Sequence, residues 1–217
     1  MMTSLFMSFD PSTQFMQLNW MMMMSTIMIL PLNFWMKKSR WNLIKKLMEK
    51  KIISEFNNLT HHKEILILST SMFMLILTNN ILGLFPYNFT ATSQIALNIS
   101  LALPTWLMLM IYGWMKFYNF MFIHLLPLGT PKPIMPMMIM IETLGNIIRP
   151  ISLSVRLTAN MIAGHLLMTL LGNMNSINII MLIFPLQIML TLFESAISMI
   201  QAYVFATLMT LYSSEIP

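Results

Sequence analysis

Apolar residues fill five long runs of the chain, and polar residues are gathered in the short stretches between them. Each run reaches the length of about 20 residues that an α-helix needs to cross a bilayer. The runs cover residues 14–36, 65–85, 95–115, 134–171 and 177–212. The pattern predicts an all-α integral membrane protein with about five membrane-crossing helices. They would form one membrane domain over residues 1–217, in which the second and third spans are a helical hairpin (65–115).

The last two runs are longer than an upright crossing requires. As continuous helices, residues 134–171 and 177–212 would each be about 55 Å long, against a hydrocarbon thickness of about 30 Å. Such a mismatch requires strong tilt or a bend, and Pro150 and Pro185 mark where bends would fall. We therefore expect residues 134–212 to form a pair of strongly inclined helices. A connector over 116–133, rich in proline and glycine, precedes them.

Positive charge is concentrated in one segment before the hairpin. Seven of the twelve Lys and Arg residues lie between Lys37 and Lys51, where Glu49 is the only acidic residue. Apolar residues recur among them at helical spacing, which predicts a basic amphipathic helix over 37–58 on a membrane surface. The two flanking membrane spans disfavour a nucleic-acid partner. By the positive-inside rule, segment 37–51 faces the matrix or cytoplasm, and the N-terminus lies on the opposite side.

Composition narrows the possible chemistry. The chain has no cysteine, and its sequence contains no glycine-rich phosphate loop and no acidic metal cluster. Only His124 and His165 lie in apolar surroundings, which disfavours a bis-histidine haem. We therefore expect no metal, no cofactor and no enzyme activity of the chain on its own. The 28 methionines exceed the needs of packing and indicate an organellar code that reads an isoleucine codon as Met. The start of the chain, without an Arg-rich presequence, agrees with this origin.

One arginine, Arg156, stands inside the apolar run 134–171. A guanidinium cannot give up its proton, and its placement at mid-bilayer costs about 2.5–3.5 kcal/mol on insertion scales. Ionisable groups at such depth mark routes along which ions or protons move. Two other interpretations stay open, because the side chain could reach to the headgroups or be held in a static ion pair.

Other polar residues form stripes along the last two runs. At 100° per residue, one set falls within about 80° on residues 134–171, and a second set does so on 177–212. The first set is Glu142, Asn146, Arg149, Arg156 and Asn160, and the second is Gln187, Thr191, Glu194, Ser198 and Gln201. His165 points elsewhere, about 140° from Glu142. Facing stripes predict a hydrated path, although such groups also serve simply to hydrogen-bond two membrane helices together.

Residues 155–167, Val-Arg-Leu-Thr-Ala-Asn-Met-Ile-Ala-Gly-His-Leu-Leu, resemble the motif of a known family. The family is subunit a of the proton-translocating F-type ATP synthase, in its mitochondrially encoded, invertebrate-type form. Further matches run through the whole chain in the family's order, at residues 9–13, 80–86, 124–131, 141–143 and 201–205. The resemblance implies a proton-channel (stator) subunit of the mitochondrial inner membrane. Its two half-channels would serve carboxylates on a ring of c subunits, beside other membrane and peripheral-stalk subunits of the complex.

The resemblance also implies roles for individual residues. Six positions match polar residues of the family's proton path: Arg156, Glu142, Glu194, His165, Asn160 and Gln201. Arg156 matches the essential arginine that faces the ring. His165 and Glu194 match positions whose residue types are often exchanged in bacterial relatives, which implies that the two act as one polar pair. Arg149 stands where many relatives have glutamine, so a role in the path and a structural anchoring role are equally open.

Two other classes of function remain open from the sequence. A membrane subunit of a respiratory complex with its own proton path, or a secondary transporter, would predict internal repeats or broken helices around a midplane site. The sequence has neither feature. A purely structural membrane subunit would predict that Arg156 can be replaced by Lys or Gln without loss of function.

Overall fold

The computed structural model describes residues 9–12, 18–29, 39–60, 63–85, 88–126, 131–174 and 180–214. All regular elements within these ranges are helical, which confirms the predicted fold class. The α-helices are α1 (Met21–Ile29), α2 (Arg40–Asn57), α3 (Lys63–Gly83), α4 (Ile95–Lys116), α5 (Tyr118–His124), α6 (Met135–Asn173) and α7 (Ile180–Ser214). Short 3₁₀ turns precede three of them: η2 (Leu18–Trp20), η3 (Ala91–Ser93) and η4 (Lys132–Ile134).

Four helices in the described ranges are long and apolar enough to cross a membrane: α3, α4, α6 and α7. They correspond to four of the five apolar runs. The remaining run, 14–36, lies largely outside the described residues, and within it the structure shows η2 and the nine-residue α1. Within the described residues, the helices that can cross a membrane therefore lie at the positions that the sequence predicts.

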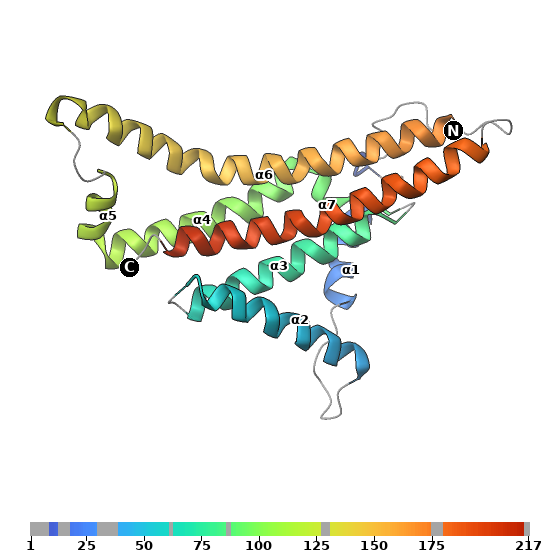
Figure 1. The fold of residues 1–217 in the computed structure, drawn as a ribbon, viewed down its shortest axis with the longest axis horizontal. Coiled ribbons are helices and arrows are strands. Elements are labelled where there is room, and N and C mark those ends of the chain that lie inside the picture. Colours follow the sequence, from blue (N-terminus) through green and yellow to red (C-terminus); the bar gives the residue numbers. More distant parts are fainter. Residues whose placement is uncertain are drawn as a thin grey trace.

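The last two helices are each continuous. α6 has 39 residues and α7 has 35, which correspond to about 58 and 52 Å at 1.5 Å per residue. They run side by side along the second half of α6, the first part of α6 extends beyond the end of α7, and α6 is visibly bent (Figure 1). Each is close to twice as long as the hydrocarbon layer is thick, so neither can stand upright in a bilayer.

The sequence of α6 explains its bend. Pro150 lies inside the helix, where it lacks a backbone N–H and crowds the carbonyl of Asn146. Ser152 Oγ then donates to the Arg149 carbonyl at 2.9 Å. A hydroxyl that bonds back to the preceding turn in this way bends a helix further. The bend therefore falls on the stretch that leads to Arg156.

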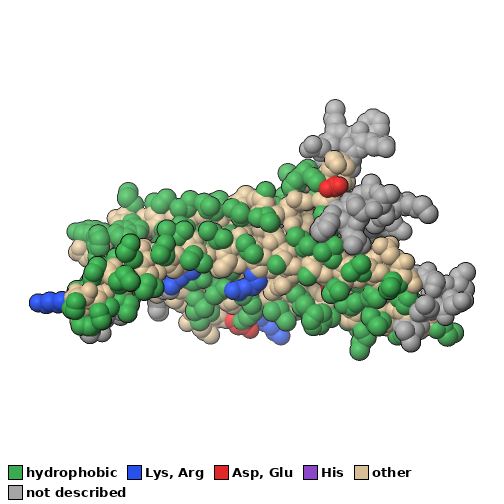
Figure 2. Space-filling view, turned by 90° about the horizontal axis from the view of Figure 1, so that it is seen from above, with side chains coloured by type: hydrophobic (Ala, Val, Ile, Leu, Met, Phe, Trp, Pro, Cys, Tyr) green, Lys and Arg blue, Asp and Glu red, His purple; other side chains and the backbone are tan. Residues whose placement is uncertain are grey.

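The hairpin of α3 and α4 supports the long pair from one side. α3 packs on α7 and α4 packs on α6, and the apolar core lies along these contacts. Ala202 and Ala206 of α7 are fully buried in this core. Small side chains four residues apart let two membrane helices approach closely. The outward surface of the molecule is mostly hydrophobic with few charged side chains, as Figure 2 shows for one long face.

α2 occupies the region of the predicted basic helix 37–58. Its last turn is fixed to the bundle by Phe56, which is fully buried and stacks on Tyr203 of α7 with ring centroids 6.4 Å apart. Trp41 and Leu47 remain exposed beside the lysines. An exposed apolar surface flanked by lysines is what a helix resting on a membrane requires.

Candidate functional site

Arg156 stands on the outer face of α6. Its side chain is exposed, as is that of Val155, whereas Leu157 and Thr158 are buried against the rest of the bundle. Within the described ranges, Arg156 forms no ion pair with a carboxylate. The guanidinium therefore faces away from the α3–α4 hairpin. A static ion pair with another described residue of this chain does not account for it.

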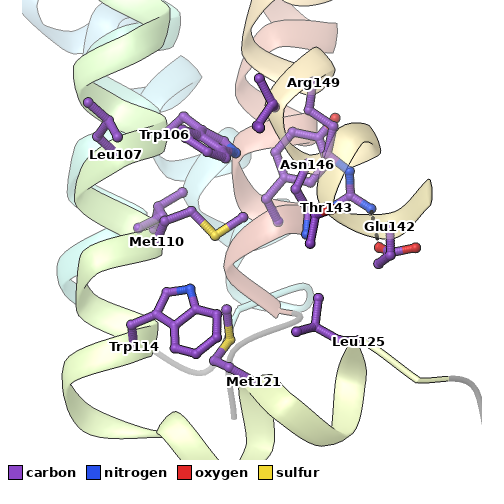
Figure 3. A pocket seen from close by; sticks show the side chains of 13 residues that line it. Trp106, Leu107, Met110, Trp114, Met121, Leu125, Glu142, Thr143, Asn146 and Arg149 are labelled. Atoms are coloured by element: carbon purple, nitrogen blue, oxygen red, sulfur yellow. Dashed lines mark ion pairs between the residues drawn. The ribbon is translucent and has the colours of Figure 1, made fainter. Parts of the chain in front are cut away.

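A cavity of about 510 Å³ lies between α4, α5 and the first half of α6 (Figure 3). We call it the Glu142 cavity, because α6 supplies its polar wall with Glu142, Asn146 and Arg149. Trp106 and Trp114 of α4 line the opposite wall. Trp106 Nε1 and Asn146 Oδ1 are buried and have no hydrogen-bond partner among the described residues. Since buried polar atoms are normally satisfied by protein or by water, this lining favours a hydrated chamber.

Arg149 is held on two sides within the Glu142 cavity. Its Nη2 lies 3.7 Å from Oε1 of Glu142, two helical turns earlier in α6. Its Cζ lies 4.9 Å from the ring centroid of Tyr212, near the end of α7. These contacts tie α7 to α6 and support the anchoring role, although Arg149 also lies beside the Glu142 carboxylate.

A second cavity, of about 120 Å³, lies between the second half of α6 and α7. We call it the His165–Glu194 cavity, and Asn160 also lines it. Glu194 is only 9% exposed. Its Oε1 and the Nε2 of His165 are buried without a hydrogen-bond partner in the described part of the chain. The cavity has room for several water molecules of about 30 Å³ each, which could join the two side chains.

Gly164 makes room for the Glu194 carboxylate. A Cβ added at Gly164 would lie 2.9 Å from Glu194 Oε1 and 3.0 Å from its Cδ. Any larger residue would therefore push the carboxylate out of its place. The sequence prediction missed Gly164. The only available signal was a glycine in the middle of a helix, where it costs about 1 kcal/mol relative to alanine.

We predict that Gly164→Ala lowers proton-driven ATP synthesis by roughly tenfold, because misplacement of a proton-transfer group by about 1 Å has effects of this order or larger. The synthesis rate would be measured in membranes after normalisation to the amount of assembled complex. Gly172→Ala is the matched control, since a Cβ there meets no atom within 4 Å. Equal rates for the two variants would contradict the assigned role of Gly164.

Arg156 lies between the two cavities along the axis of α6. Glu142 precedes Arg156 by 14 residues and His165 follows it by nine, which correspond to about 21 Å and 14 Å along the helix axis. The two cavities therefore lie on opposite sides of Arg156. Gln201 stands two turns beyond Glu194 on α7, half-buried, and lines neither cavity.

This arrangement differs from the single polar stripe expected on α6. The structure divides the stripe: Glu142, Asn146 and Arg149 line one cavity, Asn160 lines the other, and Arg156 lines neither. His165 was expected to point away from this stripe, but it shares a cavity with Asn160. The reason is that α6 bends and has different neighbours along its length, which a straight helical projection omits.

A family model described as ATP synthase A chain matches residues 15–214. The chain belongs to this family. Curated members named ATP synthase subunit a align with it over their full length and its own. The one from Drosophila mauritiana is 50% identical over 223 residues. The one from Anopheles quadrimaculatus is 47% identical over 225 residues.

Membership of the ATP synthase A chain family confirms the predicted resemblance over the whole chain. It also confirms a non-catalytic membrane subunit of the ATP synthase, the proton-channel component of its membrane sector. The four apolar helices and the insect relatives together support a mitochondrial membrane protein. A respiratory-complex subunit, a secondary transporter and a purely structural subunit are thereby set aside.

Proposed function

We propose that the two cavities belong to two proton half-channels and that Arg156 separates them where α6 faces a ring of c subunits. The observation that carries this proposal is the order along α6. The Glu142 cavity, the exposed Arg156 and the His165–Glu194 cavity follow one another. A path that is interrupted by a fixed positive charge cannot pass protons straight through. Protons must instead leave this chain on one side of Arg156 and return on the other.

The carrier between the half-channels is a carboxyl group of a ring subunit. In this scheme, a proton reaches that carboxylate by way of His165 and Glu194 and neutralises it. The neutral carboxyl can travel through lipid as the ring turns, whereas the ionised form could not do so cheaply. After nearly a full turn it releases the proton to the Glu142 cavity. Asn160 and Gln201 would hydrogen-bond water along the first of these paths.

Arg156 acts on the deprotonated carboxylate. It is permanently charged and outward-facing, and no described carboxylate of its own chain neutralises it. It therefore attracts the ionised ring carboxylate and holds it only until protonation removes the charge. Proton movement down the membrane potential supplies about 2.3 kcal/mol per charge per 100 mV, so several protons are needed for each ATP.

Charge at the two ends of the bundle supports an orientation. The start of α3, the end of α4 and the turn η4 before α6 lie at one end and carry Lys63, Lys116 and Lys132. The sequences 84–94 and 174–179, which follow the other ends of α3 and α6, contain no charged residue. By the positive-inside rule, the lysine-bearing end and the basic segment 37–51 face the matrix, and the N-terminus faces the intermembrane side of the inner membrane. The Glu142 cavity then lies toward the matrix.

A disulfide cross-linking experiment tests the ring interface. The chain has no cysteine of its own, so one introduced thiol is unique within it. Val155→Cys places a thiol on the exposed face beside Arg156, and we expect it to cross-link to a cysteine placed near the ring carboxylate. The yield would be measured by gel electrophoresis of the assembled complex after mild oxidation.

The adjacent residue provides the control. Ser154 is fully buried on the inner side of α6, so Ser154→Cys should give no ring cross-link under the same conditions. A cross-link from position 154 and none from position 155 would overturn the proposed interface. Peripheral-stalk and other membrane subunits of the synthase would then have to cover this face of α6.

A further inference from the structure

Phe9, in the described segment 9–12, lies against the candidate proton path, although it is far from α6 in sequence. The Phe9 ring meets the His165 ring edge-on, with centroids 6.2 Å apart and an interplanar angle of 85°. This is the favoured geometry for two aromatic rings, because the positive edge of one meets the negative face of the other. Phe9 is thus a direct neighbour of a residue that lines the His165–Glu194 cavity.

Two hydrogen bonds hold this segment in place. Gln94 Nε2 donates to the Phe9 carbonyl at 2.7 Å, and Asn19 Nδ2 donates to the Asp10 carbonyl at 3.5 Å. Gln94 sits between η3, whose residues are all buried, and the start of α4. Since η3 packs against α6, the position of Phe9 is fixed to the same framework that carries His165.

Packing against Phe9 contributes to the orientation of the His165 ring. Its Nε2 is buried and has no hydrogen-bond partner among the described residues. An imidazole that relays protons normally depends on a hydrogen bond to one nitrogen to set the direction of the other. Since no described residue bonds to Nε2, the Phe9 ring that meets the imidazole edge-on supplies a packing restraint on its orientation.

We propose that Phe9 is a positioning residue of the proton path, which holds the His165 ring turned toward the cavity that it shares with Glu194. The inference rests on the proposed function of that cavity and deepens it. The motif Phe-Asp-Pro-Ser at residues 9–12 thereby gains a role. Gln94 holds the backbone of Phe9, Phe9 restrains His165, and His165 faces Glu194 across the cavity.

A double-mutant cycle tests this inference in membranes that carry the complete synthase. Phe9→Leu should lower proton-driven ATP synthesis by roughly two- to tenfold, the range expected from loss of one aromatic contact. Phe9→Tyr keeps the ring and should stay within about twofold of wild type. If Phe9 acts through His165, then Phe9→Leu combined with His165→Ala should be no slower than His165→Ala alone.

A further loss in the double variant would overturn the inference, because Phe9 would then act on something other than His165. Phe89→Leu is the control for general loss of aromatic packing. Phe89 meets Trp20 at a centroid distance of 5.9 Å near the same end of the bundle, and the change should leave the rate per assembled complex unaltered.

The same measurements separate this inference from the proposed function. If His165→Ala is slow but Phe9→Leu is as fast as wild type, the positioning role of Phe9 is wrong and the path survives. If His165→Ala itself keeps the wild-type rate, the assignment of the cavity fails, and the role of Phe9 fails with it.

Discussion

Replacement of Arg156 by glutamine is expected to abolish proton-driven ATP synthesis while the complex still assembles. Glutamine is shorter and keeps hydrogen-bonding capacity, but it carries no charge and cannot attract an ionised carboxylate as a guanidinium does in a medium of low dielectric constant. The exposed position of Arg156 means that its loss removes no contact within the described core. ATP synthesis would be measured in membranes that contain normal amounts of assembled complex.

The corresponding change at Arg149 is a control for the effect of losing an arginine from α6. Arg149 forms an ion pair with Glu142 and lies over the Tyr212 ring, so Arg149→Gln should impair assembly or slow the rate without eliminating it. Substantial synthesis by the Arg156→Gln complex would show that a fixed positive charge at this position is unnecessary. The proposed separation of two half-channels would then be wrong.

The second large effect is expected at His165 and Glu194. Because they line one cavity and leave Nε2 and Oε1 without partners in the described structure, each should serve the other through water. His165→Ala or Glu194→Gln should slow proton flux by about tenfold or more, since loss of a positioned proton-transfer group commonly costs 10²–10⁴-fold. Neither single change should reach the complete loss expected at Arg156.

The exchanged double variant is the decisive comparison. His165→Glu combined with Glu194→His restores both functional groups to the same cavity in opposite places, so it should recover part of the lost rate. The rate of proton pumping driven by ATP hydrolysis would be measured for both single variants and the exchange. Independent, additive losses would mean that the two residues do not act as a pair.

The boundaries of the long helices could be predicted because length and apolarity determine which segments can cross a bilayer. Residues 134–171 were expected as one helix, and α6 is Met135–Asn173. The prolines and the glycine of the connector 116–133 rule out one regular helix, and its described residues after the end of α4 form only the short helix α5, Tyr118–His124, and the start of the turn η4. The residues of α5 are largely aromatic and apolar and lie before the first proline, so nothing in them prevents a local helix.

Fewer features of the candidate site than of the helices could be predicted from the sequence, because some of them depend on contacts between residues far apart in the chain. Arg156 could be singled out from the sequence alone, since a lone guanidinium in an apolar run is costly. The roles suggested for Gly164 and Phe9 could not be found in this way. Gly164 matters through its closeness to Glu194 on another helix, and Phe9 through its contact with His165 far along the chain.

The outward position of Arg156 affects the stability of the subunit in the membrane before assembly of the complex. A guanidinium left in lipid costs about 2.5–3.5 kcal/mol, which corresponds to a roughly 70- to 400-fold preference for any state in which it is covered or withdrawn. The solitary subunit is therefore biased toward rearrangement or degradation, and the proposed association with the ring would remove this bias. The charge that we propose acts on the ring carboxylate would thus also make the abundance of this subunit depend on the supply of its partner.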